Sequence, residues 1–142
     1  MKKFKFRLEA IMKLREFNLN KTKIAYNEVV ETINHLESEK EQLLIKREER
    51  YNIQGVKDNY NYQIQSWNKE ALLNKIEHIN QEIVRTKELE VIRRKDLQTA
   101  LQEMKVLEKL KEKKHVAYIE QMNKNEQLFY DELSLNKYHL IG

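Results

Sequence analysis

The feature that most constrains this chain is its shortage of residues that turn the backbone. Its 142 residues contain no proline and only two glycines, Gly55 and Gly142. A compact domain of this length reverses direction several times, and glycine and proline are the residues that most readily adopt the backbone angles of tight turns. Few reversals are therefore possible, and the sequence predicts long, nearly uninterrupted helices.

Disorder is the competing interpretation, because charged residues make up 35% of the chain and the mean hydropathy is -0.85. Two observations argue against it. The net charge is only +4, and Leu, Ile, Val and Phe together exceed the roughly one-fifth share that is typical of disordered chains. The apolar residues are also regularly spaced.

Two long stretches follow a heptad pattern, in which steps of four and three residues place side chains on one helix face. The first stripe consists of Leu8, Met12, Arg15, Leu19, Thr22, Tyr26, Val29, Ile33, Leu36, Lys40 and Leu43. The second consists of Leu72, Ile76, Ile79, Ile83, Thr86, Glu90, Arg93, Leu97, Ala100, Met104, Leu107, Lys111, Lys114 and Tyr118. The second stripe is weakest from Thr86 to Arg93, and the two together predict a marginal coiled-coil seam.

Between the stripes lies a polar segment, Asn52–Asn68, whose Asn, Asp and Gly content favours a turn. A reversal near Asn59 centres this segment, and we adopt it. It pairs Leu43 with Ile76, Leu36 with Ile83, Met12 with Leu107 and Tyr26 with Arg93. The heptad pattern does not distinguish this register from one shifted by a whole repeat, with the turn at Gly55.

The predicted fold is therefore all-α, a long antiparallel coiled-coil hairpin of two helices that forms a single domain over residues 1–142. The first helix is expected over about residues 3–56, the turn over about 57–62 and the second helix over about 63–135, before a C-terminal tail. Residues beyond about Ile119 have no counterpart in the first arm, so we expect an overhanging helix that frays into the tail.

The sequence offers no pattern for catalysis, a cofactor or a metal. Its two glycines lie too far apart for a phosphate-binding loop, and cysteine is absent. The scattered histidines are expected to be solvated side chains on helix surfaces. They are His35, His78, His115 and His139. We therefore predict a protein that is not an enzyme and binds no metal, cofactor or small-molecule ligand.

The start of the chain resembles the basic region of a secretory signal, but Glu9, Lys13 and Arg15 interrupt the apolar stretch that follows. No run of apolar residues approaches the roughly 18 that a membrane-spanning helix needs. We therefore expect a soluble, cytoplasmic protein.

Basic residues gather in two stretches that the hairpin would place side by side at its open end. The first contains Lys2, Lys3, Lys5, Arg7, Lys13 and Arg15 against Glu9. The second contains Lys105, Lys109, Lys111, Lys113 and Lys114 against Glu108 and Glu112. One interpretation is a solvated surface, and the sharper one is a basic plug for an acidic partner surface.

Nucleic acid would suit such a plug, because phosphate binding needs only clustered Lys and Arg. The chain contains no helix-turn-helix, no aromatic-studded sheet and no groove-gripping basic region, so we predict no nucleic-acid partner. An anionic membrane would also suit the amphipathic N-terminus, in which Phe4 and Phe6 stand among lysines. The packing of this segment at the end of a coiled coil would explain its amphipathic pattern equally well.

The only tryptophan, Trp67, falls outside the seam stripe and is expected to face outward near the turn. Steps of four, three and four residues lead from it to Ala71, Asn74 and His78 on one helix face, with Tyr51 close by on the first helix. Outward tryptophans often mark binding surfaces. A tryptophan that caps the turn is the other interpretation.

Both ends of the chain carry motifs of a known family. The opening motif consists of Phe4, Phe6, Arg7, Leu8, Leu14 and Arg15. The closing motif consists of Leu107, Leu110, Lys111, Glu112, Lys113, Tyr118, Glu126, Gln127, Asp131, Glu132 and Leu133. In these residues the chain resembles the family of the flagellar export protein FliJ. It departs from the family at Leu128 and Phe129, where charged residues are expected.

The resemblance implies a component of the bacterial flagellar type III export apparatus, a stalk that links the export ATPase ring to the membrane export gate. It implies a cytoplasmic position at the inner-membrane base of the flagellum, with membrane association only through partners and with export chaperones as further partners. The alternatives are the stalk of a virulence type III secretion system and an export chaperone. The opening Phe-x-Phe-Arg-Leu favours the flagellar system.

The resemblance also assigns candidate contact residues. At the open end, which would enter the ATPase ring, the candidates are Lys2, Lys3, Lys5, Arg7, Lys109 and Lys113. Near the turn, on the face that the family associates with the export gate, they are Leu44, Tyr51, Trp67, Ala71 and His78.

Overall fold

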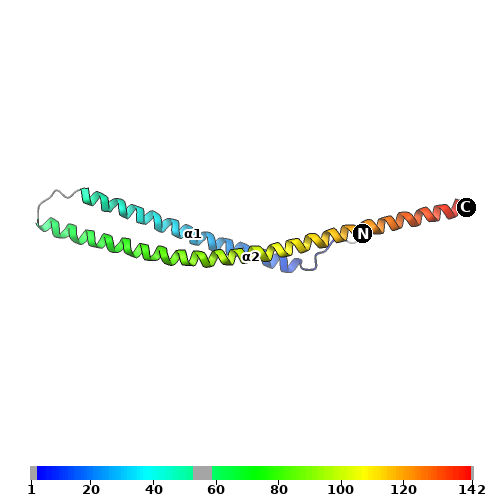
Figure 1. Ribbon diagram of the computed structural model, residues 1–142, viewed down its shortest axis with the longest axis horizontal. Helices are drawn as coiled ribbons and strands as arrows, with labels where there is room; N and C mark the ends of the chain where they lie inside the picture. Colours follow the sequence, from blue (N-terminus) through cyan, green and yellow to red (C-terminus); the bar gives the residue numbers. More distant parts are fainter. Residues whose placement is uncertain (1–2, 53–58, 142) are drawn as a thin grey trace. The chain divides into compact units, whose positions relative to one another are not determined.

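The computed structural model describes the backbone of residues 3–52 and 59–141 and the side chains of residues 3–50 and 63–137. Within these ranges the chain forms two helices and no strand (Figure 1). Helix α1 spans Glu9–Asn52 (44 residues), and helix α2 spans Asn59–Ile141 (83 residues). The prediction of an all-α helical hairpin is confirmed. Neither described helix contains a stretch apolar enough to cross a bilayer.

The chain divides into two compact units. The terminal unit comprises Met1–Leu19 and Thr99–Gly142, and the central unit comprises Asn20–Gln98. Each unit thus contains a stretch of α1 and a stretch of α2. That the two units form the single predicted domain stays a prediction.

The helix ends differ from those expected. Residues 3–8 precede α1 instead of forming its first turns, because their apolar and basic side chains alternate, and a period of two suits an extended segment rather than a helix. Helix α2 begins at Asn59, inside the segment predicted as a turn, and continues to Ile141 instead of ending near residue 135. Neither glycine nor proline occurs between these two ends, so nothing in the sequence stops the helix.

Every buried side chain among residues 3–50 and 63–137 belongs to the two predicted stripes. The buried residues are Leu19, Val29 and Leu36 on α1 and Leu72, Ile76, Ile79, Ile83, Ala100 and Met104 on α2. Among the described stripe residues only Arg15 and Lys114 are exposed, because their long side chains carry the charge out to water. The heptad prediction therefore locates the core.

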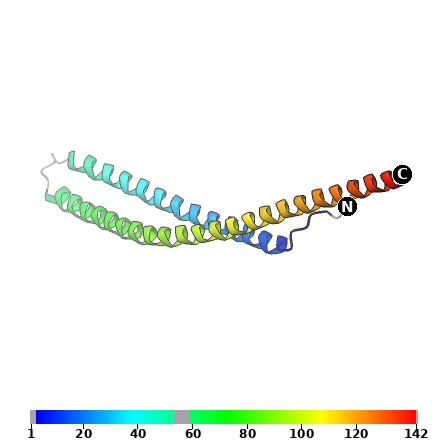
Figure 2. The same ribbon diagram turned by 45° about the vertical axis from the view of Figure 1, so that its right-hand side comes forward.

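In the central unit, α1 and α2 run side by side in opposite directions (Figures 1 and 2). Leu36, Ile79 and Ile83 form one apolar cluster, and Leu43 packs against it. This agrees with a reversal near Asn59, in which Leu36 faces Ile83.

Ion pairs in the terminal unit follow the same register. Arg15 Nη1 lies 2.7 Å from Glu103 Oε2, and Lys111 Nζ lies 3.1 Å from Glu9 Oε2. A shift by one heptad would bring Met104 to the place of Lys111 beside Glu9 and Asp96 to the place of Glu103 beside Arg15, so it would remove the Glu9 pair. The contacts therefore select the register centred on Asn59.

The polar middle of the second stripe forms a looser part of the seam. No α2 side chain between Ile83 and Ala100 is buried. The Tyr26 hydroxyl donates a hydrogen bond to Glu90 Oε1 at 3.3 Å, one stripe position away from the expected Arg93. The polar residues of the stripe predicted this weak stretch. Within it, the Glu90 carboxylate accepts a hydrogen bond from Tyr26 across the seam.

Candidate partner-binding surfaces

The segment before α1, residues 3–8, is called the N-terminal arm, and it lies against α2 within the terminal unit. The Phe4 ring stands edge-on to the His115 ring, with centroids 5.0 Å apart and planes 80° apart. The centroid of Tyr118 lies 5.5 Å from that of Phe4. Such aromatic pairs contribute about 0.5 to 1.5 kcal/mol beyond the burial of their area. Phe4 therefore anchors the arm.

A hydrogen-bonded turn leads from the arm into α1. The amide of Glu9 donates to the carbonyl of Phe6 at 3.1 Å, and that of Met12 donates to Leu8 at 2.9 Å. The Glu9 carboxylate lies in the first turn of α1, where the helix dipole favours negative charge, and it also pairs with Lys111. Such half-exposed ion pairs contribute at most about 1 kcal/mol each, so this pair serves mainly to fix how the arm and α2 align.

The basic side chains of the arm are exposed. Lys3, Lys5 and Arg7 alternate with the half-buried Phe4, Phe6 and Leu8, so the apolar side chains are partly covered while the cations face water. The remaining predicted arm residue, Lys2, lies outside the described residues. The structure thus presents three of the predicted ATPase contacts on one short segment.

The predicted α2 contacts, Lys109 and Lys113, lie on a different face from the arm. Each is two residues from Lys111, which is about 200° around the helix, and Lys111 faces Glu9 on α1. Both lysines are exposed. The structure therefore brings the predicted basic residues into one unit, but it distributes them around that unit instead of gathering them on a single face.

On α2 of the central unit, three of the predicted gate contacts form an exposed face. Trp67 is 68% exposed, and Ala71 and His78 are exposed on the same side of the helix. The imidazole of His78 lies 3.1 Å from the Glu82 carboxylate one turn further on. Trp67 contributes little to the seam, so its large apolar surface is free to contact a partner.

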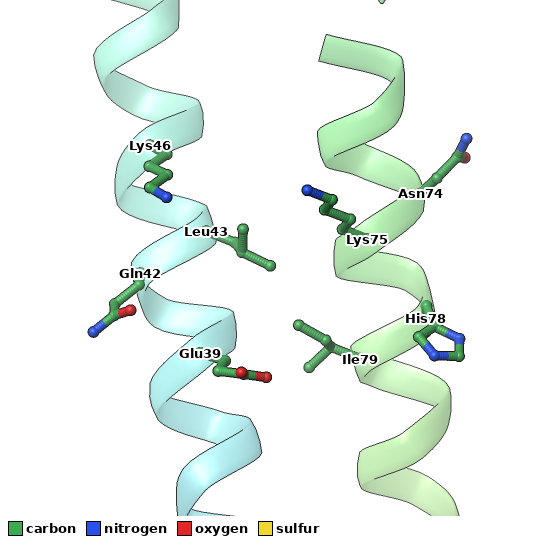
Figure 3. A pocket seen from close by; sticks show the side chains of 8 residues that line it. All are labelled: Glu39, Gln42, Leu43, Lys46, Asn74, Lys75, His78 and Ile79. Carbon is green, nitrogen blue, oxygen red and sulfur yellow. The ribbon is translucent and has the colours of Figure 1, made fainter. Parts of the chain in front are cut away.

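A groove with a volume of about 530 Å³ opens between α1 and α2 of the central unit. It is lined by Glu39, Gln42, Leu43 and Lys46 of α1 and by Asn74, Lys75, His78 and Ile79 of α2. Figure 3 shows Leu43 and Ile79 pointing toward each other across the space between the helices. Of the four predicted gate contacts with described side chains, Leu44, Trp67, Ala71 and His78, only His78 lines this groove.

The predicted contacts on α1 do not join this surface. Gln42 precedes Leu43 and lines the groove, whereas Leu44 follows Leu43 and is rotated by about 100° to the other side of the seam. Leu44 is 38% exposed there. The side chain of Tyr51 lies outside the described residues. The predicted gate contacts whose side chains are described therefore do not form one continuous face.

Two histidines have a glutamate one helical turn away. His35 Nε2 lies 3.5 Å from Glu39, and His78 Nε2 lies 3.1 Å from Glu82. Each pair supplies one nitrogen and one carboxylate, fewer than the three or four protein ligands of zinc sites. Within the described part of the chain, no three His, Asp or Glu residues gather as a metal site would require.

Sequence reasoning missed the anchoring of Phe4 and the two groove lysines, Lys46 and Lys75. The alternation of apolar and basic residues in the arm is the signal for the first. For the lysines the signal is weaker, because each stands only one position before a half-buried or buried residue on its helix, Arg47 or Ile76.

Comparison with protein families places these features in context. The family model described as Flagellar FliJ protein matches residues 4–140 of the 142-residue chain, which includes Phe4 of the arm and nearly all of both helices. No curated protein and no solved structure matches the chain. Because the family match covers almost the entire sequence, this protein belongs to the FliJ family of non-enzymatic components of the flagellar export apparatus.

Proposed function

We propose that this protein is the stalk of its flagellar export apparatus, with the terminal unit bound to the export ATPase ring and the central unit in contact with the membrane export gate. Membership of the FliJ family identifies the apparatus to which the protein belongs. The observation that carries the proposal further is the distribution of exposed cations over more than one face of the terminal unit.

A part that enters a ring meets its partner on several sides, so cations on several faces suit that role better than a single patch. Lys3, Lys5 and Arg7 occupy the arm, and Lys109 and Lys113 occupy the outer face of α2. Complementary charge accelerates association and orients the partners, and its effect falls as salt screens it. We therefore propose these five residues, with Lys2, as the ATPase contacts.

The gate contact is assigned to the exposed α2 face of Trp67, Ala71 and His78. A tryptophan that is 68% exposed adds little to folding, whereas tryptophan is among the side chains that contribute most at interfaces. Leu44 and Tyr51 belong to this proposal through family resemblance. A gate contact would hold the protein at the inner-membrane base of the flagellum, with export chaperones as further partners.

The test is a pull-down with the flagellar export ATPase of the same genome, followed by an ATPase assay on the mixture. The variant carries Lys3→Glu, Lys5→Glu and Arg7→Glu. The control carries Lys21→Glu, Lys23→Glu and Lys95→Glu, exposed residues of the central unit with the same change in net charge. Nuclease treatment of both proteins excludes bridging by nucleic acid.

We expect the unmodified chain to bind in moderate salt and to alter ATP hydrolysis. Three reversed charges should weaken binding at least about tenfold, even if each contributes only about 0.5 kcal/mol. The control should bind as the unmodified chain does, and circular dichroism should show equal helicity for all three. Equal binding by the variant and the control would refute the arm as the ATPase contact.

A further inference from the structure

The outer face of α1 in the terminal unit exposes two large apolar side chains. Leu14 is 65% exposed and Phe17 is 68% exposed. They are three residues apart, so they are neighbours on the helix surface. Leu14 follows Met12 of the seam by two residues and Phe17 precedes Leu19 by two, and two residues correspond to about 200° around a helix. The pair therefore contributes little to the seam.

The hairpin does not require apolar residues at these positions. The outer positions of packed helices are usually polar. The heptad position of Leu14 recurs every seven residues, and in the rest of α1 it is occupied first by Lys21, Glu28 and His35. A single exposed apolar side chain is ordinary, but two large neighbours form a patch, and exposed apolar patches mark binding surfaces.

The charge beside this patch is positive. Lys13 is exposed and directly precedes Leu14. The two carboxylates among residues 9–19 lie elsewhere, because Glu9 pairs with a lysine of α2 and Glu16 stands two residues after Leu14, about 200° around the helix. The patch therefore complements an apolar surface that is bordered by carboxylates, which is the same sign of charge that the cations of the arm would attract.

We propose that Leu14 and Phe17 are the apolar anchors of the contact between the terminal unit and the export ATPase ring. The inference rests on the stalk function proposed above and adds a second kind of contact to its cations. The arm leads directly into α1 through the hydrogen bond from the Glu9 amide to the Phe6 carbonyl. Leu14 stands only two helical turns after Arg7, so one partner surface can meet both.

The two kinds of contact have different roles in binding. Charges steer the partners together and orient them, and salt screens their effect. Removal of a leucine and a phenylalanine from water adds affinity that salt does not screen, and a few well-packed side chains usually provide most of the binding energy of an interface. The anchors should therefore account for the part of the affinity that persists in high salt.

The test measures the Kd of the full chain for the export ATPase of the same genome by biolayer interferometry at several salt concentrations. The variant carries Leu14→Ala and Phe17→Ala. The control carries Ile45→Ala and Ile92→Ala, which are 50% and 55% exposed in the central unit. All four residues are exposed, so circular dichroism should show equal helicity for the three proteins. The arm variant with three reversed charges serves as the comparison.

The Leu14 and Phe17 variant should bind at least about tenfold more weakly than the unmodified chain, and the control should differ from it by less than about twofold. As the salt concentration rises, the difference between the arm variant and the unmodified chain should shrink. The difference between the Leu14 and Phe17 variant and the unmodified chain should persist.

The outcomes separate this inference from the stalk function. If the arm variant binds weakly but the Leu14 and Phe17 variant binds as the control does, the anchors are refuted and the stalk function stands. A loss that disappears in high salt would also refute the anchors. If the unmodified chain fails to bind at every salt concentration, both proposals fall. Sedimentation with vesicles of anionic lipid that the variant loses, while it keeps ATPase binding, would assign the patch to a membrane instead.

Discussion

Replacement of Ile83 by alanine should destabilise this protein considerably more than the same replacement at Ile92. Both isoleucines belong to α2 and to the central unit, so the chemical change and the helix are the same. They differ in burial, because Ile83 is 8% exposed in the cluster with Leu36 and Ile79, whereas Ile92 is 55% exposed. The comparison therefore isolates the contribution of the seam.

The expected magnitudes follow from that burial. Isoleucine has three more carbon atoms than alanine, and each buried methylene contributes about 0.8 kcal/mol, so a fully buried side chain loses about 2.4 kcal/mol. Scaled by burial, the loss is about 2 kcal/mol at Ile83 and about 1 kcal/mol at Ile92, and better helix propensity returns about 0.4 kcal/mol at each site. The space left at Ile83 adds a further cost. The difference between the sites should therefore exceed about 1 kcal/mol.

The assay is urea unfolding followed by far-UV circular dichroism, with the free energy of unfolding compared at equal slopes. Equal destabilisation by the two substitutions would refute the reasoning, because it would mean that Ile83 is no more buried than a residue on the outer face. A changed slope for Ile83→Ala alone would indicate that the two units no longer unfold together.

Three further predictions concern the surface. Phe4→Ala should release the arm, so that trypsin cuts after its basic residues faster, as mass spectrometry of a time course would show, while helicity is kept. Trp67→Ala should weaken binding to the export gate yet lower the free energy of unfolding by less than about 0.5 kcal/mol, because the side chain is 68% exposed; a larger loss would make it a turn residue. A double-mutant cycle of Arg15→Ala and Glu103→Ala should give a coupling below about 1 kcal/mol that vanishes in high salt, because both side chains are about 40% exposed.

The seam was predictable because heptad spacing reports burial directly. Steps of four and three residues select one helix face, and the side chains on that face are the ones that two packed helices bury. The register of the two helices was harder to predict from the sequence, because a shift by seven residues preserves the apolar pattern. The ion pair at the start of α1 separates the two choices, because a shift by seven residues would bring Met104 instead of Lys111 beside Glu9.

The candidate sites were only partly predictable. Sequence and topology together predict that the cations gather in the terminal unit. The helix face on which each cation lies depends on which residues of each turn meet the seam. Lys109 therefore lies away from the arm, although Lys111 contacts α1. The groove depends on how closely Leu43 and Ile79 approach each other, and heptad spacing does not determine such a distance.

Disulfide trapping tests the central claim most directly, namely that the start of the chain packs antiparallel on α2 in one register. The chain has no cysteine, so two introduced thiols are the only ones present. Met12→Cys with Leu107→Cys should cross-link rapidly under mild oxidation, whereas Met12→Cys with Ala100→Cys, the pair of the shifted register, should cross-link slowly. Faster cross-linking of the second pair would contradict the register, and with it the alignment of the basic arm on α2.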